Sequence, residues 1–274
     1  MRRNSNLFIA FLLVWGCLTF IENAAAQSWT YVDKGLHIGE FKPKKFQPFR
    51  RTRITVVKIN PELYEFTLLT VSERGHEPLR TNEWCERYDL IAAINAGMYQ
   101  TDLRTHAGFM KNFDHINNSH VNSYRSATAF HPVADSLAPF YIFDLDRTPL
   151  DSIAQSYHTV FQNLRLIKRP RENRWSPQNR KWSEAALAQD SQGNVLLIYS
   201  PTPYSMHEFN SIILNLPLDI VCAQHLEGGP PASLHFSYRS ITKSFNGSSK
   251  SIFDDEGNML NGLPLPNVVG VREK

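Results

Sequence analysis

The stretch LDIVCAQHLEGGPPASL at residues 218–234 decides how we interpret this chain. Its first six residues are mainly apolar, and it then carries Glu227 followed by two glycines and two prolines. An apolar run of this length predicts a strand, and Gly and Pro allow the backbone to turn sharply where the strand ends. Glu227 is therefore expected at a sheet edge. It is either the acid of a site or a solvated residue in a plain strand-to-loop turn.

A second stretch, DLIAAINAGMY at residues 89–99, repeats this pattern. Its continuous apolar run predicts a fully buried strand, and Asn95 and Gly97 follow where that strand opens into a loop. If the two strands are neighbours, their polar ends converge on one pocket. The loop that follows carries three further polar candidates, each of which is either a site residue or an ordinary surface residue: Asp102, Arg104 and His106.

The rest of the chain is dominated by strand signals. Runs rich in β-branched and aromatic residues lie at residues 53–59, 64–71, 127–131, 139–144, 157–162, 183–189 and 195–199. The turn signal between the first two runs predicts a hairpin, and another turn joins the last two. Helical signals are limited to residues 81–88 and to a helix that begins with the capping box Ser205-Met206-His207-Glu208. We therefore predict an α+β fold, a single domain around a large mixed or antiparallel β-sheet with a few inserted helices.

Residues 1–26 have the pattern of a cleaved signal peptide. A basic start at Met1-Arg2-Arg3 precedes an apolar run at residues 7–21, and three alanines end the segment. The run is shorter than the roughly 20 residues that a membrane-spanning helix needs. We expect an exported, periplasmic or extracellular protein with its domain at residues 27–274 and no transmembrane segment after signal removal. Lipoprotein anchoring through Cys17 is the less favoured alternative.

The charge of the chain is nearly balanced. Removal of the predicted signal peptide takes away two arginines and one glutamate, which lowers the net charge from +3 to +2. This balance argues against a nucleic-acid partner, because such proteins need a basic surface to neutralise phosphates. One local basic cluster is either a solvated loop or an anion-facing rim: Lys168, Arg169, Arg171, Arg174, Arg180 and Lys181. The oligomeric state is left open.

Cysteine and histidine spacing gives little support for a cofactor. Cys85 and Cys222 lie outside any zinc or redox spacing, and either a disulfide or two buried thiols fits them. His115 with His120, and His225 with Glu227, are incomplete ligand sets. Nucleotide-binding loops and the Gly-x-Ser-x-Gly elbow are missing as well. We predict no cofactor, assign no metal ligand, and keep a divalent metal as an open alternative.

Several segments together resemble the phosphodiester glycosidase family. They are INAGMY at 94–99, GF at 108–109, SEAALAQDSQGNVLLI at 183–198, MHEFN at 206–210, HLEGGPPASL at 225–234 and LPNVVGV at 265–271. The resemblance covers nearly the whole predicted mature chain. This sequence departs from the usual family pattern at three positions: Glu227 stands for an aspartate, Pro230 for a third glycine, and Glu184 lies near the place of an arginine.

The resemblance implies an exported glycoside hydrolase that cleaves a sugar-phosphate (phosphodiester) or related cell-surface glycan linkage. Its partner would be a carbohydrate or sugar-phosphate substrate. Glu227 would be the key carboxylate, and Asp102 is our first choice for a second one. The residues expected to bind substrate are Asn95, Gly97, Arg104, His106, His225, Gly228, Gly229 and Ser233. The alternative is a non-catalytic glycan-binding or envelope/exopolysaccharide-assembly protein on the same scaffold.

Overall fold

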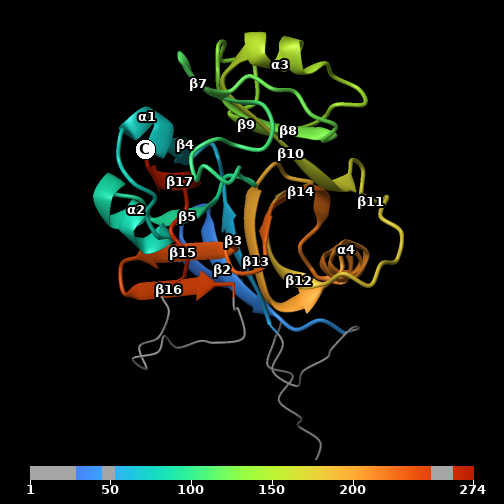
Figure 1. Cartoon of the computed structure of the whole chain (residues 1–274). Helices are drawn as coiled ribbons and strands as arrows, with labels where there is room; N and C mark the ends of the chain where they lie inside the picture. The colour runs from blue at the N-terminus through green and yellow to red at the C-terminus, as the bar shows by residue number, and fades with distance from the viewer. Residues whose placement is uncertain (1–28, 45–52, 248–261) are drawn as a thin grey trace, which may run out of the picture.

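The computed structural model describes residues 29–44, 53–247 and 262–274 (Figure 1). The predicted signal peptide and Cys17 lie outside the described residues. In the part of the chain that is described, the helices are too short or too polar to cross a membrane.

Strands outnumber helices throughout the chain. The strands are β1 (Trp29–Asp33), β2 (Leu36–Phe41), β3 (Ile54–Ile59), β4 (Tyr64–Thr70), β5 (Ala92–Asn95), β6 (Met110–Asn112), β7 (His115–Asn118), β8 (Ser126–Pro132), β9 (Phe140–Asp144), β10 (Tyr157–Lys168), β11 (Glu172–Asn173), β12 (Trp182–Asp190), β13 (Val195–Tyr204), β14 (Ile220–Gly228), β15 (Ser233–Tyr238), β16 (Ile241–Asn246) and β17 (Asn267–Glu273). The helices are α1 (Val71–Arg74), α2 (Thr81–Tyr88), α3 (Leu150–Ser156) and α4 (Met206–Asn215).

The strands form two sheets, and their pairings are antiparallel (Figure 1). The larger sheet has the order β1-β2-β3-β13-β12-β14-β10-β6-β7; β8 and β11 also pair with β10, and β9 pairs with β8. The smaller sheet has the order β16-β15-β5-β17-β4. This architecture confirms the predicted α+β fold with a large antiparallel sheet and a few helices.

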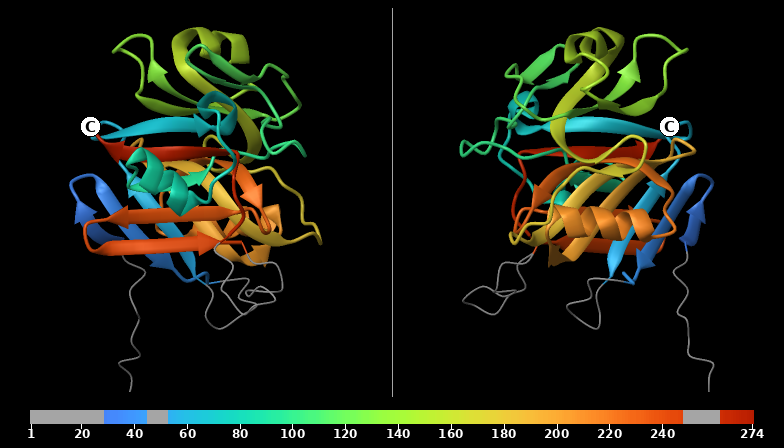
Figure 2. Two further views of the ribbon diagram at one scale, coloured as in Figure 1. Left: turned by 60° about the vertical axis from the view of Figure 1, so that its left-hand side comes forward. Right: turned by 90° about the vertical axis from the view of Figure 1, so that its right-hand side faces the viewer.

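Two apolar layers hold the sheets and α4 together. The main core joins side chains of both sheets, such as Val57 and Leu197 of the larger one and Leu68 and Val269 of the smaller one, all fully buried. Helix α4 lies across the outer face of the larger sheet, as the right-hand view of Figure 2 shows. Its apolar residues, including Ile213, pack there on β3, β12, β13 and β14. Burial of so much apolar surface is the main favourable term in folding.

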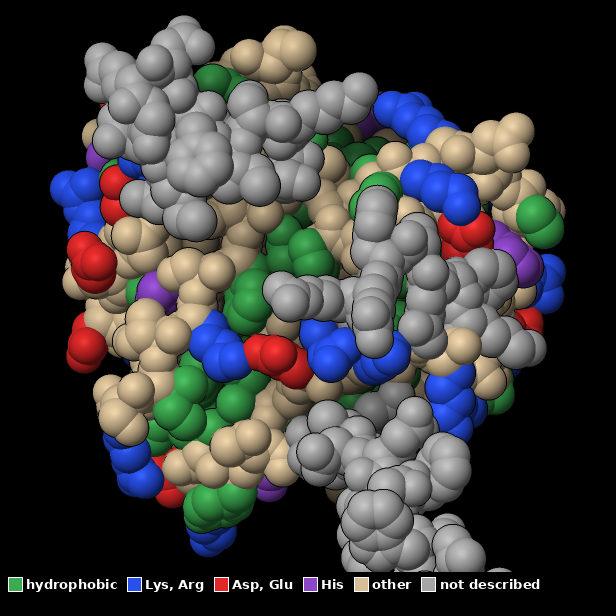
Figure 3. All heavy atoms as spheres, turned by 90° about the horizontal axis from the view of Figure 1, so that it is seen from below, with side chains coloured by type: hydrophobic (Ala, Val, Ile, Leu, Met, Phe, Trp, Pro, Cys, Tyr) green, Lys and Arg blue, Asp and Glu red, His purple; other side chains and the backbone are tan. Residues whose placement is uncertain are grey.

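The surface agrees with a nearly balanced charge. Figure 3 shows the molecule from below, where Lys and Arg side chains lie next to Asp and Glu side chains and hydrophobic side chains appear between them. Exposed ion pairs such as Lys243 with Glu40 join distant strands. Exposed pairs of this kind contribute at most about 1 kcal/mol each.

The predicted hairpin of residues 53–59 and 64–71 is wrong. The turn after β3 does form, with the Leu63 N–H donating to the Asn60 carbonyl at 3.0 Å, but the chain crosses there from one sheet to the other. β3 pairs with β2 and β13, whereas β4 pairs with β17. Residues on both faces of β3 are buried. This strand therefore needs paired strands at its edges and packed layers on both faces, which a lone hairpin cannot supply.

Other local predictions are confirmed. The turn at residues 191–194 joins β12 to β13, and α2 spans residues 81–88 as expected. Helix α4 begins with the predicted capping box: the Glu208 N–H donates to Ser205 Oγ at 3.2 Å, and the Ser205 N–H donates to Glu208 Oε2 at 3.0 Å. These features depend on neighbouring residues only, which is why the sequence predicts them well.

The two strands whose polar ends would converge if they were neighbours lie in different sheets. β14, which carries Glu227, belongs to the larger sheet, and β5, which ends at Asn95, belongs to the smaller one. The loop at residues 229–232 crosses between the sheets and leads into β15, which pairs directly with β5. The two polar strand ends therefore approach each other through this loop rather than through strand pairing.

Candidate active site

A cavity of about 620 Å³ lies at the end of β14. It is lined by Met98, Arg180, Lys181, Trp182, Ser183, Pro201, Pro203, Met206, His225, Glu227, Gly228, Gly229 and Pro230. These residues come from β12, β13, the start of α4, the end of β14 and the loop after β5. A concave site with a mainly apolar wall and a few converging polar groups is typical of a small-ligand pocket.

Glu227 lies half-buried in this cavity. Its carboxylate accepts a hydrogen bond from the Gly228 N–H at 3.0 Å. Burial is the main cause that raises the pKa of Glu227, and the negative charge of Glu184 adds to it. The Gly228 N–H and the nearby His225 lower this pKa, but they do not outweigh burial. A carboxylate with a raised pKa in a cleft is a candidate catalytic group.

His225 is held beside Glu227 by a second carboxylate. The His225 Nδ1–H donates a hydrogen bond to Glu184 Oε1, and the other oxygen of Glu184 accepts from Trp182 Nε1 at 2.8 Å. Glu184 and His225 are 2% and 3% exposed, so water does not screen the pair. Burial lowers the pKa of His225, but the charge and the hydrogen bond of Glu184 together raise it above its usual value.

Strand geometry explains why these groups converge. Glu184 and Trp182 are two residues apart on β12, where the side chain of Trp182 reaches the carboxylate of Glu184, and His225 and Glu227 lie on either side of a register shift in the pairing of β14 with β12. β12 pairs with β14, with Ala185 opposite Glu227. With its Nδ1 bonded to Glu184, His225 keeps Nε2 for a ligand in the cavity.

The loop between β14 and β15 is fixed at both of its ends. The Gly229 N–H donates to the Ser183 carbonyl at 2.9 Å, and Ser183 Oγ donates to the Gly229 carbonyl at 3.0 Å. At the other end, Asn95 Nδ2 donates to the Pro231 carbonyl at 3.0 Å and the Ser233 N–H donates to Asn95 Oδ1 at 2.8 Å. Gly229 adopts a φ of 72°, which favours glycine.

The structure brings some of the predicted site residues together. His225, Gly228 and Gly229 line the cavity with Glu227. Asn95 and Ser233 lie next to it, but their side chains bond to the loop itself. Their predicted contacts with substrate remain predictions, while their visible contacts position the loop.

The other predicted residues lie away from the lining of the cavity. Asp102 and Arg104 are exposed, and the carboxylate of Asp102 accepts hydrogen bonds from the Arg104 N–H at 3.0 Å and from Thr105 Oγ1 at 2.5 Å. The bond from Thr105 is the first cause of the lowered pKa of Asp102. The structure therefore shows Asp102 stabilising its own loop, and Glu184 is the carboxylate that lies near Glu227.

His106 is fully buried against Gly97. Burial lowers the pKa of His106 to about 4, which leaves the ring neutral at neutral pH. Its Nδ1 accepts from the Gly108 N–H at 3.1 Å. Gly97 has a φ of 150°, and a Cβ added there would overlap His106 and Asn163, so glycine is required. Gly97 and His106 thus shape the loop after β5.

Sequence reasoning missed four residues near Glu227. Two of them, Glu184 and Trp182, hold His225. The other two, Tyr99 and Tyr124, lie close to Glu227. Burial raises the pKa values of both tyrosines, the negative charge of Glu227 raises them further, and the pKa of Tyr99 reaches about 12. A signal for Glu184 was present, because a glutamate within the small apolar run of residues 183–188 is expected to be buried with a partner. Tyr124 lies in an irregular loop, and its sequence neighbours carry no such signal.

The basic cluster of residues 168–181 divides into two parts. Arg180 and Lys181 line the cavity, with Arg180 stacked on Trp182 at 5.5 Å and Lys181 paired with Glu208 at 2.6 Å. The interpretation of this cluster as an anion-facing rim thus fits its last two residues. Arg169 lines a different cavity, described below.

Neither a metal group nor a disulfide is seen within the described parts of the chain. Groups of three or more His, Cys, Asp or Glu side chains suited to a metal ion do not occur there. Cys85 and Cys222 are both buried free thiols, which answers the question of their pairing. Burial raises the pKa of Cys222 to about 11, so this thiol stays protonated at neutral pH.

Comparison with known proteins identifies the family. A sequence model of the phosphodiester glycosidase family matches residues 88–272, a segment that includes Glu227, His225 and Glu184. The chain belongs to the phosphodiester glycosidase family. This confirms the resemblance seen in the sequence. A search of curated protein sequences gives no significant match.

Solved structures share the fold of this family member. The catalytic domain of zebrafish N-acetylglucosamine-1-phosphodiester alpha-N-acetylglucosaminidase, auto-inhibited by its pro-peptide, superimposes with a TM-score of 0.62 at 10% identity, over 88% of this chain and 85% of that one. A hypothetical protein from Synechocystis gives a TM-score of 0.57 at 13% identity, over 88% of this chain and 62% of that one. At such low identity the likeness concerns the fold alone.

Proposed function

We propose that this chain is an exported glycoside hydrolase that cleaves a sugar-phosphate (phosphodiester) or related cell-surface glycan linkage, with Glu227 as its key carboxylate. The observation that carries the proposal is the position of Glu227, half-buried in a cavity beside the buried pair of His225 and Glu184. Membership of the phosphodiester glycosidase family supports the type of reaction. Export rests on the leader pattern of residues 1–26.

Glu227 is suited to the sugar side of the reaction. Cleavage of a glycosidic bond passes through an oxocarbenium-like centre, which a carboxylate can stabilise or attack, or for which it can activate water. Among the described residues, the carboxylate whose charge acts on Glu227 is Glu184, and its two oxygens are already bonded to His225 and Trp182. We therefore assign the contact with the sugar to Glu227 and the positioning of His225 to Glu184.

His225 is suited to the phosphate side. A phosphomonoester leaves as a stable anion, so it needs donors that hold its charge more than it needs a strong general acid. The pKa of His225 is raised by Glu184, which keeps the ring cationic to higher pH, and its Nε2 is available. Arg180 on the cavity wall adds positive charge, whereas the charge of Lys181 is paired with Glu208.

The proposal is tested with purified mature protein and aryl and sugar phosphodiesters of α-N-acetylglucosamine and related sugars. We expect turnover, and a loss of about 10²–10⁴-fold in kcat/KM on Glu227→Gln, the size typical for removal of a general acid or base. Glu172→Gln is the matched control, because Glu172 is exposed and its ion pair within the described residues is with Arg174 at 3.2 Å. Glycan binding without turnover would instead favour the non-catalytic glycan-binding alternative, and equal turnover in Glu227→Gln would refute Glu227 as the key carboxylate.

A further inference from the structure

We infer that a second ligand site, for a small ring-bearing anion, lies between β9, α3 and the end of β10. A cavity of about 430 Å³ is found there, and its lining shares no residue with the cavity around Glu227. In Figure 1, α3 with β8 and β9 forms the upper part of the molecule. The site is independent of the proposed hydrolase activity.

Two arginines of this cavity have charges that no acidic partner neutralises directly. Arg147 is exposed, and its guanidinium makes no hydrogen bond or ion pair with the residues that the structure describes. Arg169 Nη2 donates to Gln189 Oε1 at 3.0 Å and lies 3.1 Å from Cys222 Sγ, both of which are uncharged groups. The Nε of Arg169 is buried without a partner. Arginine is well suited to bind carboxylate and phosphate, because its planar fork matches their geometry.

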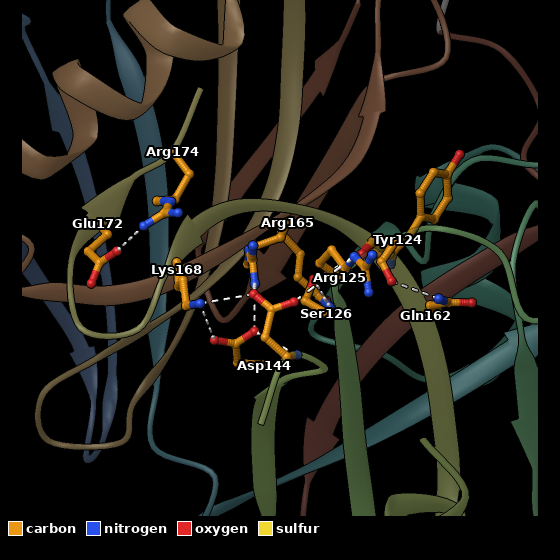
Figure 4. Close-up of polar contacts among 12 residues, drawn as sticks. Tyr124, Arg125, Ser126, Asp144, Gln162, Arg165, Lys168, Glu172 and Arg174 are labelled. Atoms are coloured by element: carbon orange, nitrogen blue, oxygen red, sulfur yellow. Dashed lines mark hydrogen bonds and ion pairs between the residues drawn. The ribbon is translucent and has the colours of Figure 1, made fainter. Parts of the chain in front are cut away.

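Two acidic groups near the cavity, Asp144 and Asp146, are already paired, whereas Asp135 and Asp151 are exposed beside the lining residues Ser136 and Ser152. Asp144, which lines it, accepts from Arg165 at 2.5 Å and lies 3.6 Å from Lys168 (Figure 4). Asp146 lies 2.8 Å from Arg165, 2.9 Å from Lys168 and 4.0 Å from Arg125. Arg147 and Arg169 together with Arg125, Arg165 and Lys168 outnumber these four aspartates by one, so positive charge is in excess at this end of the molecule. An anion that enters the cavity meets net positive charge.

The remaining wall is aromatic and carries hydroxyl groups. The ring centroids of Tyr141 and Phe143 lie 4.7 Å apart, and those of Phe143 and Tyr157 lie 5.7 Å apart. The guanidinium carbon of Arg169 lies 4.6 Å from the ring centroid of Tyr141. Ser152 and Ser156 of α3 complete the wall. Aromatic faces pack against flat rings and against the apolar faces of sugars, while guanidinium and hydroxyl groups bind charged and polar substituents. The chemistry fits a ring that bears one carboxylate or phosphate, which means an acidic sugar or an aromatic acid.

Isothermal titration calorimetry on the mature protein tests this site with glucuronate, benzoate and, as a neutral probe, methyl glucoside. We expect at least one of the two acids to bind and the neutral glycoside not to bind. Arg147→Gln should weaken binding about tenfold or more, because a charge-assisted contact is lost. Arg174→Gln is the matched control, since Arg174 is also exposed but lies outside the cavity lining. The acid that binds more tightly distinguishes an acidic sugar from an aromatic acid.

Other results overturn the inference. These are no binding of either acid at tens of millimolar, equal binding of the neutral glycoside, or equal weakening by the two arginine variants. Binding that is lost in Glu227→Gln would place the ligand in the other cavity and refute a separate site. Because the Arg147 side chain has no hydrogen-bond or ion-pair partner among the described residues, its substitution should leave the thermal unfolding midpoint unchanged, and this is measured alongside. A lowered midpoint would contradict its assignment as a free ligand-facing group.

Discussion

Replacement of Glu184 by glutamine tests how the site controls the charge of His225. Glutamine keeps the shape of the side chain and an acceptor for Trp182 Nε1, but it removes the negative charge next to Nδ1 of His225. The burial that lowers the pKa of His225 is unchanged. In the variant this pKa should therefore fall below its ordinary value of 6.5, whereas in the natural protein it lies above that value.

The expected size follows from the loss of one buried, charge-assisted hydrogen bond. Such a bond contributes roughly 1.5–3 kcal/mol. With Glu184 only 2% exposed, solvent does not reduce this figure. If the cationic form of His225 holds the leaving phosphate, kcat/KM at pH 7 should fall about 10–150-fold, since each 1.36 kcal/mol is a factor of ten.

The measurement is a profile of kcat/KM between pH 4.5 and 9.5 with an aryl phosphodiester of α-N-acetylglucosamine. Activity needs the protonated ring, so the basic limb should lie above pH 6.5 in the natural protein and move below it in Glu184→Gln. Glu172→Gln should leave the profile unchanged. An unchanged basic limb in Glu184→Gln would refute the role of His225 as a cation set by Glu184. The Glu184–His225 pair should make its full contribution to the free energy of unfolding below pH 6.5. This contribution should decline as the pH rises through the pKa that His225 has in the folded protein.

Three further changes test the groups around this pair. Glu227→Gln should raise the midpoint of thermal unfolding at pH 7–8 and have little effect on it below pH 4.5. Burial raises the pKa of Glu227, so the ionised carboxylate destabilises the fold at any pH above the pKa that Glu227 has in the unfolded chain. A lower midpoint at pH 8 would contradict this. Gly97→Ala should lower the free energy of unfolding in urea by about 2 kcal/mol or more, because the added Cβ overlaps two buried polar side chains at a positive φ. A decrease of less than about 0.5 kcal/mol would show that the loop rearranges to make room for the Cβ. Asp102→Asn should leave kcat/KM within about twofold, since its carboxylate bonds only to its own loop; a hundredfold loss would restore Asp102 as the catalytic partner.

Local signals predicted the elements well, but they could not predict which strands pair. The apolar runs placed β3, β4, β12 and β13, and the capping box placed α4. The pairing of β3 with β13, more than a hundred residues away, depends on long-range contacts that no turn signal encodes. A turn shows that the chain changes direction, and burial on both faces of a strand decides whether the next strand returns beside it or joins another sheet.

The same limit explains the prediction of the site. Glu227, Gly228 and Gly229 follow one apolar run, so their position at a strand end could be read from the sequence. Asp102 was chosen as the second carboxylate for its nearness in sequence to Asn95, and nearness in sequence says little about contact across a sheet. Glu184 lies beside Glu227 only because β12 pairs with β14. The sequence showed which residues carry chemistry, and the strand order showed which of them meet.

The charges in the cavity indicate how a substrate would lie. Glu227 lines the inner wall next to His225, and Glu184 is buried behind that ring, so this end is neutral or negative even when the ring is protonated. Lys181 is paired with Glu208, whereas Arg180 is exposed and makes no ion pair within the described residues. A sugar that develops positive charge is best stabilised at the acidic end, and a phosphate at the end with the unpaired guanidinium. Under the proposed function, His225 lies beside Glu227, so its Nε2 would hold the phosphate as the bond between sugar and phosphate breaks.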